Sequence, residues 1–121
     1  MDETLLFPCS HGEDAPERAT VPFIAAATAA ASGRSAIVIC TVEAVWLGLA
    51  SHAERVTEEG MPAVLDLQRT LVDGGGEIWL CSACTTKRGI TGDHPLVPGA
   101  RIVGAATIVE ALASGRAITL A

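Results

Sequence analysis

The sequence predicts a three-layer α/β/α sandwich built on a mainly parallel sheet of five strands. Short apolar runs rich in β-branched residues alternate along the chain with longer segments of strong helix formers. Glycine and proline residues separate the two kinds of segment. Strands that alternate with helices pair in parallel and are covered by those helices, so a single domain is expected over residues 1–121.

Each of the predicted strands is bounded by turn residues. Pro8 follows the first apolar run at once, so Cys9 is expected at the carboxyl end of that strand. The second run ends on Cys40. The third has no polar alternation, and both of its faces are therefore expected to be covered. The predicted strands are 4–7, 35–40, 77–80, 101–103 and 117–120.

The first predicted helix covers residues 17–32, with Asp14 as its expected cap and Pro16 in its first turn. Pro22 fits this helix badly, because proline lacks the amide that an interior position donates. Either Pro22 kinks the helix, or the helix begins near Thr20, which then becomes the cap.

The later helices are shorter. Residues 41–50 are expected to form a helix with Val42 on its buried side, residues 51–60 a surface loop, and Pro62 the start of a further helix. The last predicted helix covers 104–114 and has an apolar side that is expected to face the sheet. Its members are Ile108, Val109 and Leu112.

Charge and composition exclude several function classes. The net charge is −6, and with two Phe, two Trp and no Tyr the chain offers few rings on which bases can stack, so no nucleic-acid partner is expected. The amino terminus has no basic region of a signal peptide, and the longest mostly apolar stretch, 21–31, is too short to span a bilayer. We therefore expect a cytoplasmic protein without a membrane partner, whose four cysteines stay reduced.

The segment 74–90 carries the main candidate for chemistry. Its buried strand leads into Cys81-Ser82-Ala83-Cys84, which is expected to open a helix running toward Arg88. Free amides and the helix dipole at such a position favour the thiolate, which is the nucleophilic form of cysteine. Cys81 and Cys84 are therefore the predicted catalytic residues, although a buried cysteine is often only a small apolar side chain.

Other candidates lie at the same predicted edge of the sheet. Ligands of parallel sheets bind beyond the carboxyl ends of the strands, where Cys9, Cys40 and Cys81 are all expected. His11 comes after the first strand and could hydrogen-bond or protonate a thiolate. Arg88 could stabilise an anionic persulfide, or only complement the dipole of its helix. The ordinary interpretation of Cys9 and Cys40 is that they are small core residues.

Three segments resemble the DsrE/DsrF-like family of sulfur-relay proteins, to which TusD and YchN also belong: 11–19, 79–90 and 104–107. The cysteine followed by Arg88-Gly89-Ile90 is the most specific of these features. The resemblance implies a flavodoxin-like or YchN-like fold, homo-oligomers such as trimers or hexamers, and sulfur transfer through a cysteine persulfide. Counting back from Arg88, it places the sulfur carrier on Cys81 and leaves the role of Cys84 open.

The resulting prediction is a persulfide carrier without cofactors or a bound metal, which exchanges sulfur with a protein donor or acceptor. One alternative is a redox protein that cycles Cys81 and Cys84 between dithiol and disulfide. A second is a thiolate module for zinc or copper(I) that adds Cys9, Cys40 or His11 to this pair. A purely structural oligomeric protein is the remaining alternative.

Overall fold

The protein, described here by a computed structural model over residues 3–120, contains a five-stranded sheet in which every strand pairing is parallel. The strand order is β4-β3-β2-β1-β5. The strands are β1 (Leu5–Cys9), β2 (Ala36–Cys40), β3 (Glu77–Cys81), β4 (Ala100–Val103) and β5 (Arg116–Ala117). The predicted α/β fold with a parallel sheet is thus confirmed.

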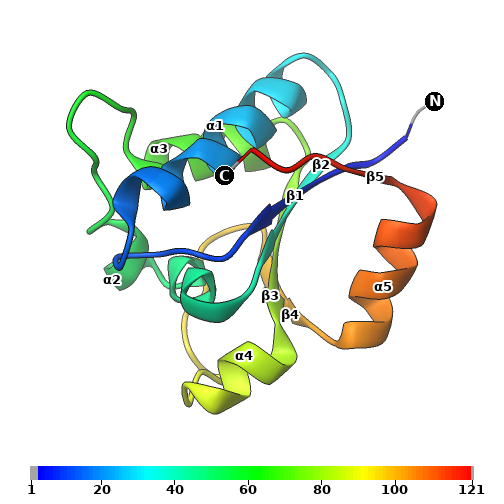
Figure 1. The fold of residues 1–121 in the computed structure, drawn as a ribbon. Helices are drawn as coiled ribbons and strands as arrows, with labels where there is room; N and C mark the ends of the chain where they lie inside the picture. Colours follow the sequence, from blue (N-terminus) through cyan, green and yellow to red (C-terminus); the bar gives the residue numbers. More distant parts are fainter. Residues whose placement is uncertain (1–2, 121) are drawn as a thin grey trace.

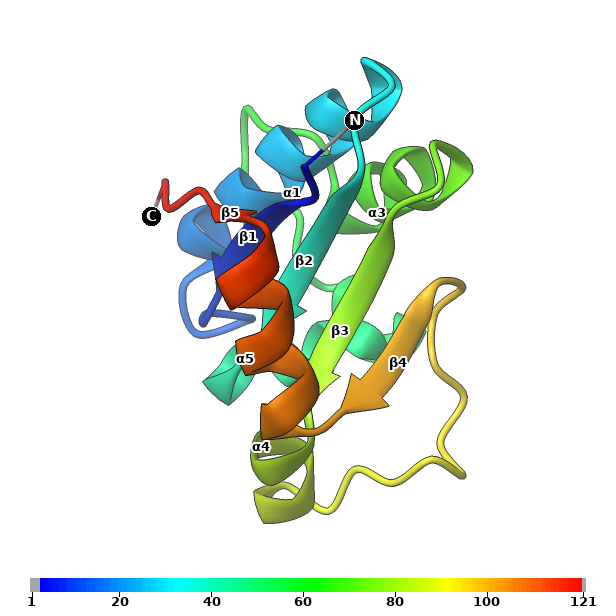
Figure 2. The same cartoon turned by 90° about the vertical axis from the view of Figure 1, so that its right-hand side faces the viewer.

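Helices lie on both faces of this sheet (Figure 1). On one face lie α1 (Pro16–Ala31) and α3 (Val64–Asp73), and on the other lies α5 (Ala105–Ser114), as the rotated view in Figure 2 also shows. The short helix α4 (Ser82–Lys87) continues directly from β3 at the carboxyl edge of the sheet. Between β2 and α3 the chain forms the 3-10 helix η1 (Val42–Gly48) and then α2 (Ala50–Ala53).

The sheet separates two apolar clusters of unequal size. The larger lies under α1 and α3 and includes Phe23 and Leu71. The smaller consists of Leu6, Ile39, Trp79 and Val103, with Ile108 and Ala111 of α5 packed against it. Neighbouring residues of β3 alternate between these clusters, and all three of its central residues are buried, so the prediction that both faces of this strand are covered is confirmed.

The start of α1 differs from the prediction. The helix begins at Pro16, so Pro22 lies inside it and the alternative start at Thr20 is wrong. Asp14 is not the cap: Ala15 holds that position, without a side-chain hydrogen bond. The Asp14 carboxylate instead accepts the Gly12 amide at 2.8 Å, because the turn before the helix binds this carboxylate locally.

The segment after β2 also departs from the expected pattern. Residues 42–48 form a 3-10 helix and not an α-helix, and the Val42 side chain is 49% exposed where a buried position was expected. Its backbone has a φ of +52°, an unusual value for a β-branched residue. The predicted loop 51–60 contains the end of α2, and α3 begins at Val64, after Pro62.

Among the helices of residues 3–120, α5 alone covers its face of the sheet (Figure 2). Val109 is 63% exposed and Leu112 is 39% exposed, so the prediction that both face the sheet is wrong; only Ile108 of that set packs against the second cluster. A single helix contacts the sheet along a narrow stripe, and side chains beside that stripe remain in solvent. The terminal strand is also shorter than predicted, with two residues, Arg116–Ala117, in place of 117–120.

Among residues 3–120, none of the helices combines the length and the hydropathy that crossing a membrane requires.

Candidate functional site

Cys81 occupies the junction between a strand and a helix. It is the last residue of β3 and the N-cap residue of α4, and its thiol is free and partly exposed. The chain turns here because buried apolar residues end at Leu80 and helix-compatible residues begin at Ser82. The predicted position of Cys81 is confirmed.

The surroundings of Cys81 favour its anionic form. Partial burial acts to raise the pKa of this thiol, but the backbone amide and side chain of Cys84, with the backbone amide of Ala83, outweigh that effect and hold the pKa below its usual value. The amides are those that a helix start leaves without an intrahelical partner. A lowered pKa and partial exposure are the two properties that a reactive cysteine needs.

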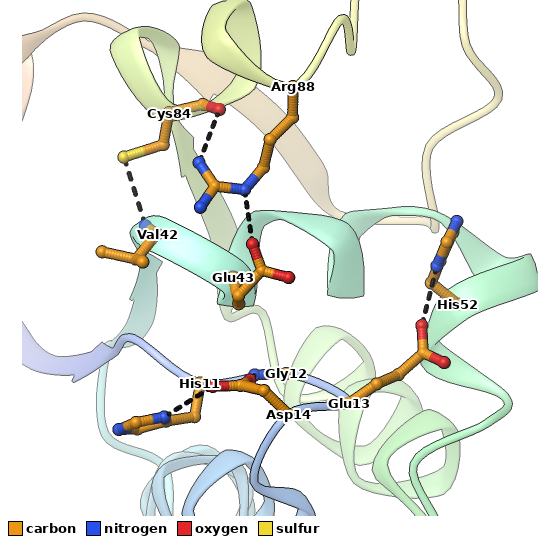
Figure 3. Close-up of polar contacts among 9 residues, drawn as sticks. All are labelled: His11, Gly12, Glu13, Asp14, Val42, Glu43, His52, Cys84 and Arg88. Carbon is orange, nitrogen blue, oxygen red and sulfur yellow. Dashed lines mark hydrogen bonds and ion pairs between the residues drawn. The ribbon is translucent and has the colours of Figure 1, made fainter.

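Cys84 lies one turn further along α4 and has its own backbone donor. The Val42 amide donates a hydrogen bond to the Cys84 Sγ at 3.2 Å, as Figure 3 shows. The donor belongs to the first residue of η1, the residue with the positive φ. The sequence offered no signal for this contact, because valine is a residue that avoids such backbone angles.

Arg88 joins α4 to η1 (Figure 3). Its Nε donates to Glu43 Oε2 at 2.8 Å and its Nη1 donates to the Cys84 carbonyl at 3.2 Å. The Arg88 side chain is 14% exposed and that of Glu43 is 42% exposed, so the ion pair is partly shielded from water on the Arg88 side. Arg88 therefore holds the two elements that carry Cys84 and Val42, and its described hydrogen bonds go to oxygen atoms and not to a thiol.

Cys9 and Cys40 do not share the exposed edge with Cys81. They are 2% and 0% exposed, they face each other across β1 and β2, and both belong to the larger apolar cluster. Burial raises the pKa of Cys9 to about 12 and raises the pKa of Cys40 well above its ordinary value. Both thiols are thus protonated at neutral pH and closed to a protein partner.

The strand register explains this separation. Cys40 pairs with Leu80 and not with Cys81, so Cys81 lies one residue further along the sheet than Cys9 and Cys40. Successive side chains of a strand point to opposite faces. The expectation that Cys9, Cys40 and Cys81 meet at one edge is therefore wrong, because Cys81 is offset by one residue from the other two.

His11 lies in the loop after β1, and its side chain is 33% exposed. Its Nδ1 lies 3.1 Å from Asp14 Oδ2, and Figure 3 shows the ring turned toward Asp14 and not toward Cys84. The next residue but one, Glu13, forms a second contact that the sequence did not indicate. Its Oε1 lies 2.8 Å from Nδ1 of His52, and together they tie the β1–α1 loop to α2.

The described chain, residues 3–120, contains no group of three or more His, Cys, Asp or Glu side chains placed to hold a metal ion. The positions of the cysteines explain this result, since two thiols are in the core and two are at α4. The thiolate metal module is therefore not supported by the arrangement of these side chains.

Comparisons with known proteins agree with this architecture. A search of curated proteins found no match. Among solved structures, the crystal structure of the YchN protein from E. coli superimposes with a TM-score of 0.80 and 18% sequence identity, covering 99% of this chain and 100% of that one. At this identity the similarity shows the fold. A model of the DsrE/DsrF-like family matches residues 4–120. The chain therefore belongs to the DsrE/DsrF-like family.

Proposed function

We propose that this protein carries sulfur as a persulfide on Cys81 within a cytoplasmic sulfur relay. The DsrE/DsrF-like family is associated with sulfur relay. The observation that carries the finer proposal is the place of a free, partly exposed thiol at the junction of β3 and α4, where the backbone of the first helical turn lowers its pKa. The amides of the first turn of α4 favour the anion of Cys81.

The proposed transfer is an exchange without net oxidation. The Cys81 thiolate attacks the outer sulfur of a donor persulfide, a new S–S bond forms on Cys81, and the donor leaves as a thiolate. In the second half, an acceptor thiolate attacks the outer sulfur on Cys81, and the Cys81 thiolate is regenerated. A low thiol pKa helps both halves, because Cys81 is the nucleophile in the first and the leaving group in the second.

Intact-mass spectrometry of the reduced protein tests this proposal. After incubation with a sulfane-sulfur donor, the wild type is expected to gain the mass of one sulfur atom, and Cys81→Ser is expected to gain none. Cys84→Ser is the matched control, because it removes a partly exposed thiol from the same helix. Sulfur loading of Cys81→Ser equal to that of the wild type would rule out Cys81 as the carrier.

The dithiol alternative is favoured by one observation, the influence of the Cys84 side chain on the Cys81 thiol. A redox protein would lose two hydrogen atoms under mild oxidant, as a disulfide forms between Cys81 and Cys84. That loss of mass, absent from both single variants and unaccompanied by any sulfur gain in the wild type, would favour the redox function over the carrier.

We also propose that the chain forms a homo-oligomer, with α5 in the contact. Val109 and Leu112 expose apolar surface on a helix that has no buried residue of its own. Light scattering of the wild type and Val109→Glu tests the assignment. A monomeric wild type, or an oligomer unchanged by Val109→Glu, would contradict it.

A further inference from the structure

A cavity of about 310 Å3 lies on the α3 side of the sheet, outside the cysteine site. Helix α3 forms most of its wall, with Leu65, Gln68 and Val72 among the contributing residues. Ala50 of α2 and Val97, from the segment before β4, complete the apolar part. Its volume is at the lower end of the range in which proteins bind small organic molecules.

One side chain in this wall has an unused hydrogen-bond acceptor. Gln68 is 2% exposed, and its Nε2 donates to the Leu47 carbonyl at 2.9 Å. Its Oε1 is the one buried side-chain nitrogen or oxygen atom without a partner among the described residues. Exchanging the two ends of the amide would not remove the problem, because the bond to Leu47 requires the nitrogen where it is.

The lining contains one cationic and one anionic side chain, Arg69 and Asp73, so its charges are balanced and do not select an ion. Arg69 also forms an ion pair at 3.1 Å with Asp66, which lies outside the lining on the exposed surface of α3. Leu65, Val72 and Val97 supply apolar walls. An occupant matched to this lining is neutral, mostly apolar and equipped with one hydrogen-bond donor.

We propose that this cavity binds a small neutral molecule, of the size of one or two fused rings, that donates an N–H or O–H group to Oε1 of Gln68. A donor from the occupant satisfies the unpaired acceptor while the bond from Nε2 to Leu47 is kept. Less than 1 Å2 of Oε1 is exposed, so binding requires the atoms that cover Oε1 to move aside while the Gln68 amide stays in place. This site is independent of the proposed sulfur chemistry.

The side-chain NMR signal of Gln68 can be assigned directly from the composition of the chain. Gln68 is its only glutamine and the sequence contains no asparagine, so one pair of side-chain NH2 resonances reports on this amide alone. The experiment is an NMR titration of the full chain with indole and, separately, with N-methylindole. The two probes have similar apolar surfaces and differ in the ring N–H donor.

Indole is expected to shift the Gln68 NH2 pair and the backbone amides of residues 65–73, and to bind about tenfold more tightly than N-methylindole. In Gln68→Met, which keeps an unbranched side chain without the acceptor, the two probes are expected to bind equally. Equal binding to the wild type would overturn the role of Oε1. Absence of binding by either probe, the outcome for a cavity that holds only water, would overturn the site.

Discussion

Two pairs of cysteines in this small chain have opposite properties. Cys9 and Cys40 end neighbouring strands, lie in the core and have raised pKa values. Cys81 also ends a strand of the same sheet, yet with Cys84 it is partly exposed, and its pKa is lowered. The difference is one residue of register, because Cys40 is level with Leu80. A one-residue offset reverses the face on which a side chain lies, and with it the chemistry of a thiol.

The environment of each thiol also depends on the segment that follows its strand. After Cys81 the chain enters α4 immediately, so the free amides of the first turn lie beside the thiol. After Cys9 the chain runs into a loop, where the Cys9 Sγ donates to the carbonyls of His11 at 3.5 Å and Ala19 at 3.7 Å. Amide donors stabilise the Cys81 thiolate, whereas burial is the main cause that raises the pKa of Cys9 and keeps it a thiol.

Alkylation rates provide the strongest test of this contrast. At about pH 8 a thiol with the pKa of Cys9 is ionised to roughly one part in ten thousand, whereas a thiol with a pKa below the ordinary value is ionised to a tenth or more. Cys81 is thus expected to react with iodoacetamide about a thousandfold faster than Cys9 or faster still. Peptide mapping over time measures both rates. As a control, all four cysteines should react at similar rates in denaturant. Rapid labelling of Cys9 in the folded protein would contradict the proposed difference between the two thiols.

The pH dependence of stability separates the pairs in a second way. Folded Cys9 keeps its proton up to about pH 12, whereas the unfolded chain loses it near 9.0, so the free energy of unfolding falls as pH rises between these values. The slope is at most about 1.4 kcal/mol per pH unit for one such thiol. Urea unfolding at a series of alkaline pH values is expected to show a shallower fall for Cys9→Ala than for the wild type.

Cys81→Ala is the matched comparison, because the sign is reversed. The lowered pKa of Cys81 adds stability as pH rises from that pKa toward 9.0, and the contribution is lost as pH falls through the folded pKa. Cys81→Ala is therefore expected to lack the rise in the free energy of unfolding that the wild type shows up to pH 9.0. Cys9→Ala is expected to lack the Cys9 part of the fall that the wild type shows above pH 9.0. Identical pH profiles for the two variants would contradict the assigned environments.

The smallest expected effect is on the free energy of unfolding when Arg88, which holds α4 against η1, is removed. Arg88→Ala removes the bonds to Glu43 and to the Cys84 carbonyl, and is expected to lower the free energy of unfolding by about 1–2 kcal/mol. Arg69→Ala is the control, since its side chain is 70% exposed and its ion pair should contribute about 0.5 kcal/mol or less. Denaturant midpoints measure both, and equal losses would show that Arg88 is no more than a surface charge.

The fold could be predicted from the sequence to the extent that it depends on local patterns. Apolar runs bounded by turn residues located β1 to β4, while the last strand was predicted at 117–120 and lies at Arg116–Ala117; the abrupt change after Leu80 located the start of α4. The errors lie where tertiary packing decides. Val109 and Leu112 have the pattern of a buried helix face, but α5 has no neighbouring helix to cover them.

The site was predicted only in part for a related reason. The position of Cys81 depends on one strand and one helix that are adjacent in the sequence. The burial of Cys40 depends on register between strands far apart in the chain, and the contact between Val42 and Cys84 joins residues 42 positions apart. Such pairings leave no pattern within a single segment, and Val42 even adopts a backbone angle that its own residue type disfavours.

Cys81 is both the last residue of β3 and the N-cap residue of α4, and this position determines how protein partners can reach its sulfur. The Cys81 sulfur is therefore held one side-chain carbon from the backbone at the end of the sheet, and not at the end of a long side chain. Under the proposed function, donor and acceptor therefore bind at the same place and one after the other. The residence time of each partner then limits the rate of sulfur transfer.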